Sequence, residues 1–551
     1  MTKYFLVNNA SRAAVYGIGT YVRQLAECIR GGRLQYELCI LDIHSDEKEF
    51  TVEEDERGIP HYKIPSLPDG GKSFPYYRYI LFLLESYVRE EDDVVFHFNF
   101  GQHFDLVRLL KAKYRYCRIL YTVHYFNWCF TLNGNVTRFR KIINKEVEDA
   151  EKKNIQGDFY RDKRLFSLCD EVIALSKFAY ELLQVDYSIS KSKLHLVYNG
   201  MTQNPNMVQH CSGNVLNQEI LFVGRLDEIK GIGYIIQAFK QILTCRENVH
   251  LTLVGDGDFS RYLKLCDGIW DKVTFTGKLS VEQLEKFFCQ ATIGVQPSFH
   301  EQCSYSAIEM MAHGIPFVAT DSTGLSEMMD YTSECLIHID EDNFQEAEFV
   351  EQLASKMEIL LSNSQVRAQV SEKLLQLFHE RYNMNCMRNA MENILCQNEK
   401  KGYSISNDFL PYLDDEFVRL VNATPVLDMD YVGLTGIGCY LWWRIETLKS
   451  QTNRKDILRS SKIQEHLIYY IDWLSDVLDE DGLEAFSPSF ESTPLIWLLR
   501  SLRDAGFYKT KVDSVIRKIH SLGVDIYTDH ITVFDNSMIS RTALKIYNLN
   551  L

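Results

Sequence analysis

The sequence predicts an α/β protein with two parallel, doubly wound sheets and an additional all-helical region at its C-terminal end. Strand-like apolar runs alternate with helical stretches between residues 4 and 198, and the alternation resumes after a polar stretch. From about residue 400 to residue 551, long helical periodicity replaces this alternation. We therefore expect two α/β domains, followed by a helical domain.

The first half begins with a strand-like run at residues 4–9, followed by Gly17-Ile18-Gly19 and a helical stretch, TYVRQLAECI. Glycines at a helix start allow a phosphate to approach the helix N-terminus, although the third glycine of a dinucleotide fingerprint is absent. The polar, non-periodic stretch at 199–218 is interpreted as an interdomain linker. Further strands of the first half are expected at residues 94–98, 119–124, 172–176 and 194–198.

The second half opens with a buried strand at residues 219–223, and an amphipathic helix is predicted from Gly231 onward. Arg225 and Lys230 lie in the loop between them, at the carboxyl end of the strand, where open α/β sheets bind ligands. Two cations beside a helix N-terminus suit a diphosphate, because Arg binds bidentately and Lys supplies a point charge. An isolated Arg and Lys on a loop are more often simply solvated.

Two glutamates stand eight positions apart further along the chain. Glu301 is expected in a loop after a strand that ends at Pro297-Ser298, and Glu309 on the helix that follows. Such a site suits a ligand rich in hydroxyls and phosphate, since carboxylates accept from hydroxyls and helix N-termini attract anions. A structural alternative is open, because Ser306-x-x-Glu309 also matches a capping box.

Composition excludes several classes of protein. The net charge of −16 argues against a general nucleic-acid binder, which needs a basic face. No apolar run approaches 18 residues, so no transmembrane helix is expected, whereas peripheral membrane contact is left open. The N-terminal residues lack the apolar core of a signal peptide. The 14 cysteines show no C-x-x-C pair and no metal-ligand spacing, which predicts a reducing, cytoplasmic location and no metal site.

An ordered set of motifs resembles the retaining glycosyltransferases of family 4, which have the GT-B fold of two facing Rossmann-like domains. The set is Gly224-Arg225-x4-Lys230-Gly231, Val254-Gly255-Asp256-Gly257, Phe275-Thr276-Gly277 and Glu301-x7-Glu309, and the likeness covers most of residues 1 to about 395. The resemblance implies an acceptor-side domain at 1–205, a donor domain at 206–385 and a helix crossing back at 386–400. Helical periodicity predicts an accessory domain at 401–551.

The resemblance also implies roles for single residues. Arg225 and Lys230 would hold the donor diphosphate and stabilise its developing charge. Glu301 would contact hydroxyls of the donor sugar, Glu309 would accept from the ribose hydroxyls, and His124 would lie near the reacting carbon. The remaining expected donor-binding residues are Gly17, Gly19, Gly224, Gly255, Thr276, Gly277, Gln302, Cys303 and Ser304.

The activity implied is metal-independent hexosyl transfer from a nucleotide-diphosphate sugar with retention of configuration, without a cofactor and with a UDP-sugar favoured over a GDP-sugar. The acceptor stays open between a peptide or protein, a glycan, a lipid-linked sugar and a small molecule. Two alternatives are open: a UDP-sugar epimerase, which shares the GT-B fold, and a degenerate family member that binds nucleotide or peptide as a scaffold without chemistry.

The chain departs from the family pattern Glu-Gly-Phe-Gly, because Gln302 and Ser304 replace the two glycines that let backbone approach the sugar. This version resembles a bacterial subgroup associated with radical-SAM peptide maturation. In the tail, a glycine-rich loop expected at 432–438, before an apolar helix, weakly resembles one repeat of the lanthionine-cyclase toroids. The zinc ligands of the cyclases are missing, so a helical packing or acceptor-docking domain without chemistry is favoured.

Overall fold

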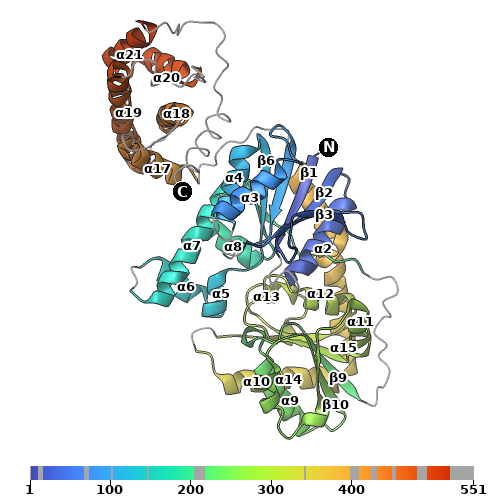
Figure 1. Cartoon of the computed structure of the whole chain (residues 1–551). Helices are drawn as coiled ribbons and strands as arrows, with labels where there is room; N and C mark the ends of the chain where they lie inside the picture. Colours follow the sequence, from blue (N-terminus) through green and yellow to red (C-terminus); the bar gives the residue numbers. More distant parts are fainter. Residues whose placement is uncertain are drawn as a thin grey trace.

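A computed structural model gives three bodies of structure: two α/β domains joined along one side, and a separate group of helices beyond the first (Figure 1). It describes residues 2–9, 17–67, 74–100, 103–145, 148–203, 217–340, 343–396, 409–423, 431–449, 454–480 and 493–521. Most of the predicted linker, and the residues that would join the crossing helix to the tail, lie outside these ranges. The predicted α/β fold with added C-terminal helices is confirmed.

The first domain is built on an eight-stranded sheet of order β3-β4-β2-β1-β5-β6-β7-β8. Every neighbouring pair is parallel except β3 and β4. The central strands are almost wholly buried, as expected for a parallel sheet covered on both faces. The strands are β1 (Thr2–Asn9), β2 (Tyr36–Ser45), β3 (Thr51–Glu54), β4 (Pro60–Pro65), β5 (Asp93–Phe98), β6 (Tyr116–Val123), β7 (Glu171–Ala174) and β8 (Leu194–Leu196).

Helices cover both faces of this sheet (Figure 1). They are α2 (Gly17–Arg30), α3 (Phe74–Leu84), α4 (Phe104–Lys113), α5 (Asn127–Leu132), α6 (Val136–Ile143), α7 (Ala150–Leu168) and α8 (Lys177–Val185). Gly17 to Gly19, expected as a loop, instead form the first turn of α2. The helix therefore presents its N-terminus directly at the carboxyl edge of the sheet, because α2 follows β1.

The second domain contains a six-stranded, fully parallel sheet of order β11-β10-β9-β12-β13-β14. Its strands are β9 (Gln218–Val223), β10 (Val249–Val254), β11 (Val273–Gly277), β12 (Ile293–Gln296), β13 (Phe317–Thr320) and β14 (Leu336–Ile337). Its helices are η1 (Glu228–Lys230), α9 (Ile232–Leu243), α10 (Phe259–Leu265), η2 (Trp270–Lys272), α11 (Val281–Gln290), α12 (Tyr305–Ala312), α13 (Leu325–Met328), η3 (Ser333–Cys335), α14 (Glu346–Ser362) and α15 (Ser364–Leu377).

A π-helical turn, η4 (Phe378–Tyr382), leads from α15 into α16 (Met384–Cys396), which packs against α2 of the first domain. The backbone N–H of Arg33 donates to Glu392 (2.6 Å), and Arg118 donates to the carbonyl of Ile394 (2.8 Å). Met201, on the segment leaving the first domain, exchanges backbone hydrogen bonds with Tyr382 and Met384. Both crossings between the domains therefore meet at one place, which is where a hinge would act.

The tail is helical: α17 (Leu410–Ala423), α18 (Tyr431–Leu448), α19 (Arg454–Glu480), α20 (Thr493–Asp504) and α21 (Lys509–Ser521). The prediction of a loop at 432–438 is wrong, since these residues lie inside α18. A Cβ on Gly438 would collide with the ring of Tyr470, so this glycine lets α18 approach α19 closely. The guanidinium of Arg164 on α7 lies 4.5 Å from the Phe104 ring and 5.8 Å from that of Tyr412, which connects α17 to the first domain.

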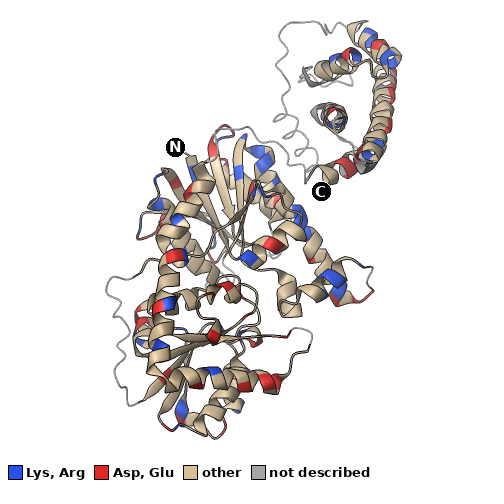
Figure 2. Ribbon diagram, turned by 180° about the vertical axis from the view of Figure 1, so that it is seen from behind, with Lys and Arg blue, Asp and Glu red and all other residues tan. Residues whose placement is uncertain are grey.

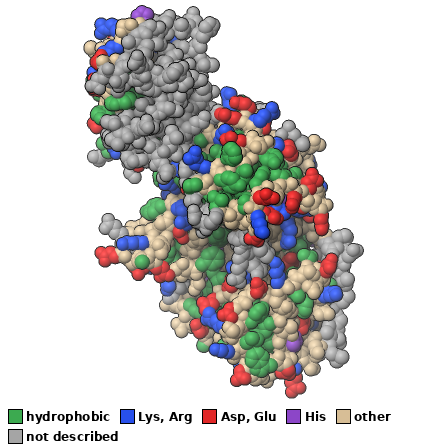
Figure 3. All heavy atoms as spheres, in the orientation of Figure 1, with side chains coloured by type: hydrophobic (Ala, Val, Ile, Leu, Met, Phe, Trp, Pro, Cys, Tyr) green, Lys and Arg blue, Asp and Glu red, His purple; other side chains and the backbone are tan. Residues whose placement is uncertain are grey.

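The surface carries both signs of charge interspersed along the helices (Figure 2). Exposed hydrophobic side chains form separate groups over the two α/β domains (Figure 3), and Phe82 is the most exposed aromatic among them at 68%. Among the helices the structure describes, none is long and apolar enough to cross a membrane.

Candidate functional site

The two sheets direct their carboxyl edges toward a shared cavity of about 770 Å³. The first domain contributes residues that follow β6, β7 and β8, together with the first turns of α2. The second contributes the ends of β9 and β10, the loop after β12, and α12. This edge is where parallel α/β sheets place their ligands, because loops and helix N-termini converge there.

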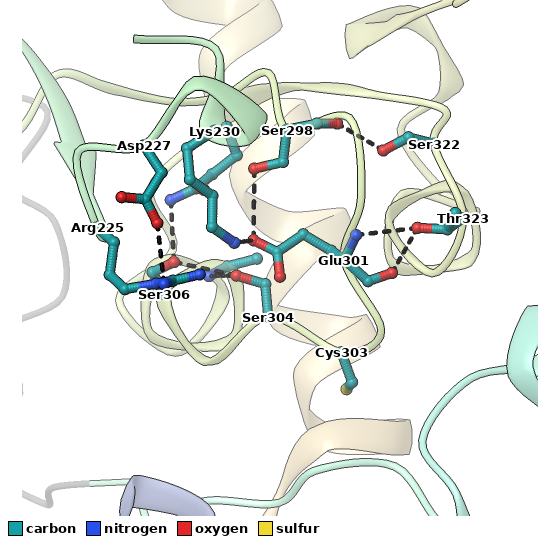
Figure 4. Close-up of polar contacts among 12 residues, drawn as sticks. Arg225, Asp227, Lys230, Ser298, Glu301, Cys303, Ser304, Ser306, Ser322 and Thr323 are labelled. Atoms are coloured by element: carbon teal, nitrogen blue, oxygen red, sulfur yellow. Dashed lines mark hydrogen bonds and ion pairs between the residues drawn. The ribbon is translucent and has the colours of Figure 1, made fainter. Parts of the chain in front are cut away.

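Arg225 and Lys230 bracket the turn between β9 and α9. Arg225 forms an ion pair with Asp227, at 2.9 Å between Nη1 and Oδ2, and Lys230 forms one with the Glu301 carboxylate (Figure 4). Gly231 makes this turn possible: its φ is 72°, and a Cβ there would come within 2.6 Å of the Pro297 carbonyl oxygen. The turn therefore delivers two cations to the cavity, each already matched by a carboxylate.

Hydrogen bonds from Ser322 and Thr323 hold the loop that carries Glu301. Thr323 accepts from the Glu301 backbone N–H (2.9 Å) and donates to the Glu301 carbonyl (2.6 Å), while Ser322 donates to the carbonyl of Ser298 (2.6 Å) (Figure 4). These bonds hold the loop against the segment after β13 and leave the Glu301 carboxylate directed at Lys230. The side chains of Glu301 and Lys230 are each 15% exposed, so their charges interact with little screening.

Glu309 lies on α12 and lines the same cavity. Burial raises the pKa of its carboxyl to about 7, although the Arg23 guanidinium on α2 acts in the opposite direction. The capping-box alternative is wrong, because the N-cap of α12 is Ser304, whose side chain accepts from the Ala307 N–H, and not Ser306. Glu309 is therefore not needed for capping and is free to accept from a ligand.

His124 follows β6 on the opposite wall. Its Nε2 lies 3.0 Å from Oδ1 of Asn99, and the Asn99 amide nitrogen faces the carbonyls of Val7 and His97. An amide oxygen only accepts, so Nε2 carries the proton and Nδ1 keeps its lone pair. Burial, with a smaller contribution from His97, lowers the pKa of His124 to about 3, so the imidazole is neutral.

The cavity wall includes every predicted site residue except Gly19, Thr276 and Gly277. Gly19 lies within α2, away from the wall. Thr276 and Gly277 end β11, where the Gly277 carbonyl accepts from the backbone N–H of Gly255 (3.1 Å), so they support the wall from outside. The predicted site residues that do line the cavity are His124, Gly17, Gly224, Arg225, Lys230, Gly255, Glu301, Gln302, Cys303, Ser304 and Glu309.

Several lining residues were not predicted from the sequence, notably Thr20, Arg23, Asn199, His300 and Tyr305. Thr20 and Arg23 follow Gly17 at three-residue spacing on α2, so helical periodicity could have placed them on one face. No local pattern identifies the others, because the opposite domain makes them part of the site.

Gln302 and Cys303, the two residues that follow Glu301, form hydrogen bonds to the first domain. Gln302 accepts from the Ser176 hydroxyl (2.8 Å), and the Asn199 amide donates to the Cys303 carbonyl (2.6 Å). Glu327 on α13 accepts from the Lys177 N–H and the Tyr198 hydroxyl, each at 2.6 Å. The loop that carries Glu301 is thus held by both domains, and Gln302, where the family has glycine, makes one of these bonds.

Two family models match the chain over these two domains. The model described as Glycosyltransferase Family 4 matches residues 15–203, and the model described as Glycosyl transferases group 1 matches residues 217–363. Among solved structures, the sucrose-phosphate synthase of Thermosynechococcus elongatus has a TM-score of 0.57 at 19% identity, covering 72% of this chain and 99% of that one. The HepE protein of Anabaena has a TM-score of 0.54 at 15% identity, covering 72% and 100%. The fold is therefore that of the GT-B glycosyltransferases.

Sequence relatives with curated descriptions agree with this comparison of structures. An uncharacterized glycosyltransferase of Methanocaldococcus jannaschii is 33% identical over 175 residues, which is 29% of this chain and 45% of that protein. The mannosylfructose-phosphate synthase of Agrobacterium fabrum is 24% identical over 349 residues, 57% of this chain and 73% of that protein. The chain spans about half the length of the archaeal relative. The two family models match one α/β domain each, so both domains of the GT-B fold resemble those of glycosyltransferases in these families.

Proposed function

We propose that this protein is a retaining glycosyltransferase that moves a hexosyl group from a UDP-sugar to an acceptor hydroxyl. The observation that carries the proposal is the convergence of Arg225, Lys230, Glu301 and Glu309 on one cavity, opposite Gly17 and His124. The second domain would take the donor, and the first would present the acceptor. We place the reaction in the cytoplasm and give it no metal or cofactor.

The donor diphosphate would bind between the turn at Arg225–Lys230 and the N-terminus of α2. Both cations are paired with carboxylates in the structure. Entry of the donor would exchange these pairs: Lys230 and Arg225 turn to the phosphates, and Glu301 is released to accept from sugar hydroxyls. Asp227 is left to solvent, to which its side chain is 30% exposed, so the exchange avoids leaving a buried charge unpaired.

The ribose of the nucleotide would lie over α12, with its hydroxyls donating to Glu309. This role requires the carboxylate form, which the raised pKa of Glu309 makes dependent on pH near neutrality. The HepE structure of Anabaena is a complex with UDP-glucose, and relatives of this chain include a mannosyltransferase of Mycolicibacterium hassiacum and an N-acetylglucosaminetransferase of Salmonella typhimurium. We favour UDP over GDP as the nucleotide, and the sugar is left to experiment.

In the proposed reaction the acceptor oxygen forms a bond to the anomeric carbon as the bond from that carbon to the diphosphate oxygen breaks. Attack occurs from the face that the diphosphate leaves, so the configuration is retained. The proton of the acceptor hydroxyl passes to the departing phosphate, and Arg225 and Lys230 stabilise the remaining negative charge. Neutral His124, held by Asn99, would direct its Nδ1 lone pair to a sugar hydroxyl near the reacting carbon.

The stereochemistry of donor hydrolysis tests this proposal without knowledge of the acceptor. Glycosyltransferases that lack an acceptor can transfer slowly to water, so the purified protein is incubated with UDP-α-glucose in the presence of EDTA and followed by proton NMR. We expect α-glucose to form before the β anomer, and EDTA to leave the rate unchanged. Initial release of β-glucose would contradict retention. Appearance of an epimeric UDP-sugar without free sugar would favour an epimerase.

A further inference from the structure

His300, which immediately precedes Glu301, has a buried side chain to which the proposed reaction assigns no role. It is 5% exposed, and neither ring nitrogen has a hydrogen-bond partner among the residues the structure describes. Burial, reinforced by the nearby Lys230 charge, lowers its pKa to about 3, so the ring is neutral, with one N–H donor and one acceptor. Buried polar groups of native proteins are nearly always paired, which makes two unpaired nitrogens in a cavity wall a sign of a missing ligand.

The surroundings of His300 are aromatic and come from the first domain. Its ring meets that of Phe130 edge-on, with centroids 6.0 Å apart and planes at 83°. Phe130 is 44% exposed, and its centroid lies 5.8 Å from that of Tyr125, the residue after His124. All three rings line the cavity that contains Glu301 and His124. This part of the wall therefore joins aromatic faces to a neutral donor and acceptor, and none of the three side chains carries charge.

We propose that His300, Phe130 and Tyr125 form the acceptor subsite, and that the acceptor group entering it is a pyranose ring. The direction of transfer rests on the function proposed above, whereas the binding of a sugar ring does not. A pyranose has an apolar face of C–H groups that packs on aromatic rings, and its hydroxyls donate and accept together, as the imidazole requires. These three side chains carry no charge for a charged peptide or a lipid phosphate, and the nearby Lys230 is paired with Glu301 and assigned to the donor diphosphate.

The subsite has to open for the sugar to enter. The His300 nitrogens are buried, so a hydroxyl reaches them only when a side chain packed against the ring moves, and Phe130 is packed against it. Phe130 lies on α5, a helix of six residues, and nearly half of its side chain faces solvent. Rotation of such a side chain costs little, and the hydrogen bonds that the sugar makes with His300 replace none that the protein had.

Binding measurements with simple sugars test the subsite directly. The full chain, saturated with UDP, is titrated with the methyl α- and β-pyranosides of glucose, galactose, mannose and N-acetylglucosamine, followed by saturation-transfer NMR. We compare the wild type with Phe130→Ala and His300→Phe, and use Phe82→Ala on α3 as the matched exposed-aromatic control. A peptide of Ser and Thr residues serves as the competing class of acceptor.

We expect at least one pyranoside to bind, and both subsite variants to weaken it fivefold or more while UDP affinity stays within twofold. His300→Phe should not lower the thermal midpoint, since it removes two unpaired buried nitrogens and keeps a planar aromatic ring of slightly larger size. Binding unchanged in both variants, or no binding by any pyranoside, would overturn the subsite. Failure of UDP-sugar binding or turnover would instead refute the function proposed above, and pyranoside binding would still be measured in that case without nucleotide.

Discussion

Replacement of Lys230 by alanine should impair transfer far more than it affects folding. The Lys230 ammonium is mostly buried and forms an ion pair with the Glu301 carboxylate, and in the proposed reaction it turns to the leaving diphosphate. Two unit charges 4 Å apart interact by about 4 kcal/mol at the effective dielectric of such a site. Loss of one donor to a developing charge typically costs ~2.7–4 kcal/mol. We therefore expect kcat/KM to fall by a factor of about 10²–10³.

The assay is the rate of UDP release from a UDP-sugar, measured over a range of donor concentrations. The backbone bond from the Lys230 N–H to the Asp227 carbonyl (3.1 Å) does not depend on the side chain, so the turn should be preserved. The thermal midpoint should fall moderately, because the Glu301 carboxylate loses its partner. Lys264→Ala, which removes an exposed lysine on α10, is the matched control and should behave as wild type. A folded Lys230→Ala protein whose kcat/KM stays within threefold of the wild type would refute the assignment.

Three further predictions concern carboxyl groups and the loop of the site. The Glu309 carboxylate is needed for donor binding, and burial raises the pKa of this group to about 7. The affinity for UDP-glucose, measured by calorimetric titration, should therefore rise with pH between 6 and 8. The Glu309→Gln variant should bind UDP-glucose weakly and show no such rise. Burial raises the pKa of Asp162 on α7 to about 7. The folded state therefore keeps this proton to a higher pH than the unfolded state does. As a result, the free energy of unfolding falls as the pH rises from about 4 to 7. Asp162→Asn should remove that fall and be more stable in urea at pH 8 by up to about 4 kcal/mol, whereas equal pH profiles would contradict it. Gln302→Ala loses the bond to Ser176 and should lower the unfolding free energy by about 1 kcal/mol, with no change in thermal midpoint counting against an interdomain role.

The local parts of the site could be predicted from the sequence because they depend on short stretches of chain. Arg225 and Lys230 belong to one strand-to-helix turn, so the end of β9 and the start of α9 were enough to bring them to the carboxyl edge. Glu301 and Glu309 likewise follow from one loop and one helix. The cap of α12 was misplaced by two residues, from Ser304 to Ser306, since both are serines and the pattern alone does not distinguish them.

The remaining site residues depend on how the two domains face each other. The sequence does not distinguish His300, which becomes a candidate ligand-binding residue only in the structure, where its nitrogens are buried without partners and Phe130 of the other domain packs against its ring. Asn199 enters the site through a bond to the Cys303 carbonyl, 104 residues away along the chain. In the tail, periodicity predicted the helix of α18 but not the role of Gly438, which is set by the close approach of Tyr470.

The most direct test of the central claim is isothermal titration of UDP-glucose into the wild-type protein and into Arg225→Ala. The account predicts one site per chain, and a loss of affinity of tenfold or more in the variant, since the Arg225 guanidinium leaves Asp227 to bind the diphosphate. At 100 times its dissociation constant the ligand should also stabilise the wild type by about 2.7 kcal/mol. Equal affinity in the two proteins, or no binding of UDP-glucose, GDP-mannose or ADP-glucose to the wild type, would contradict the donor site described above.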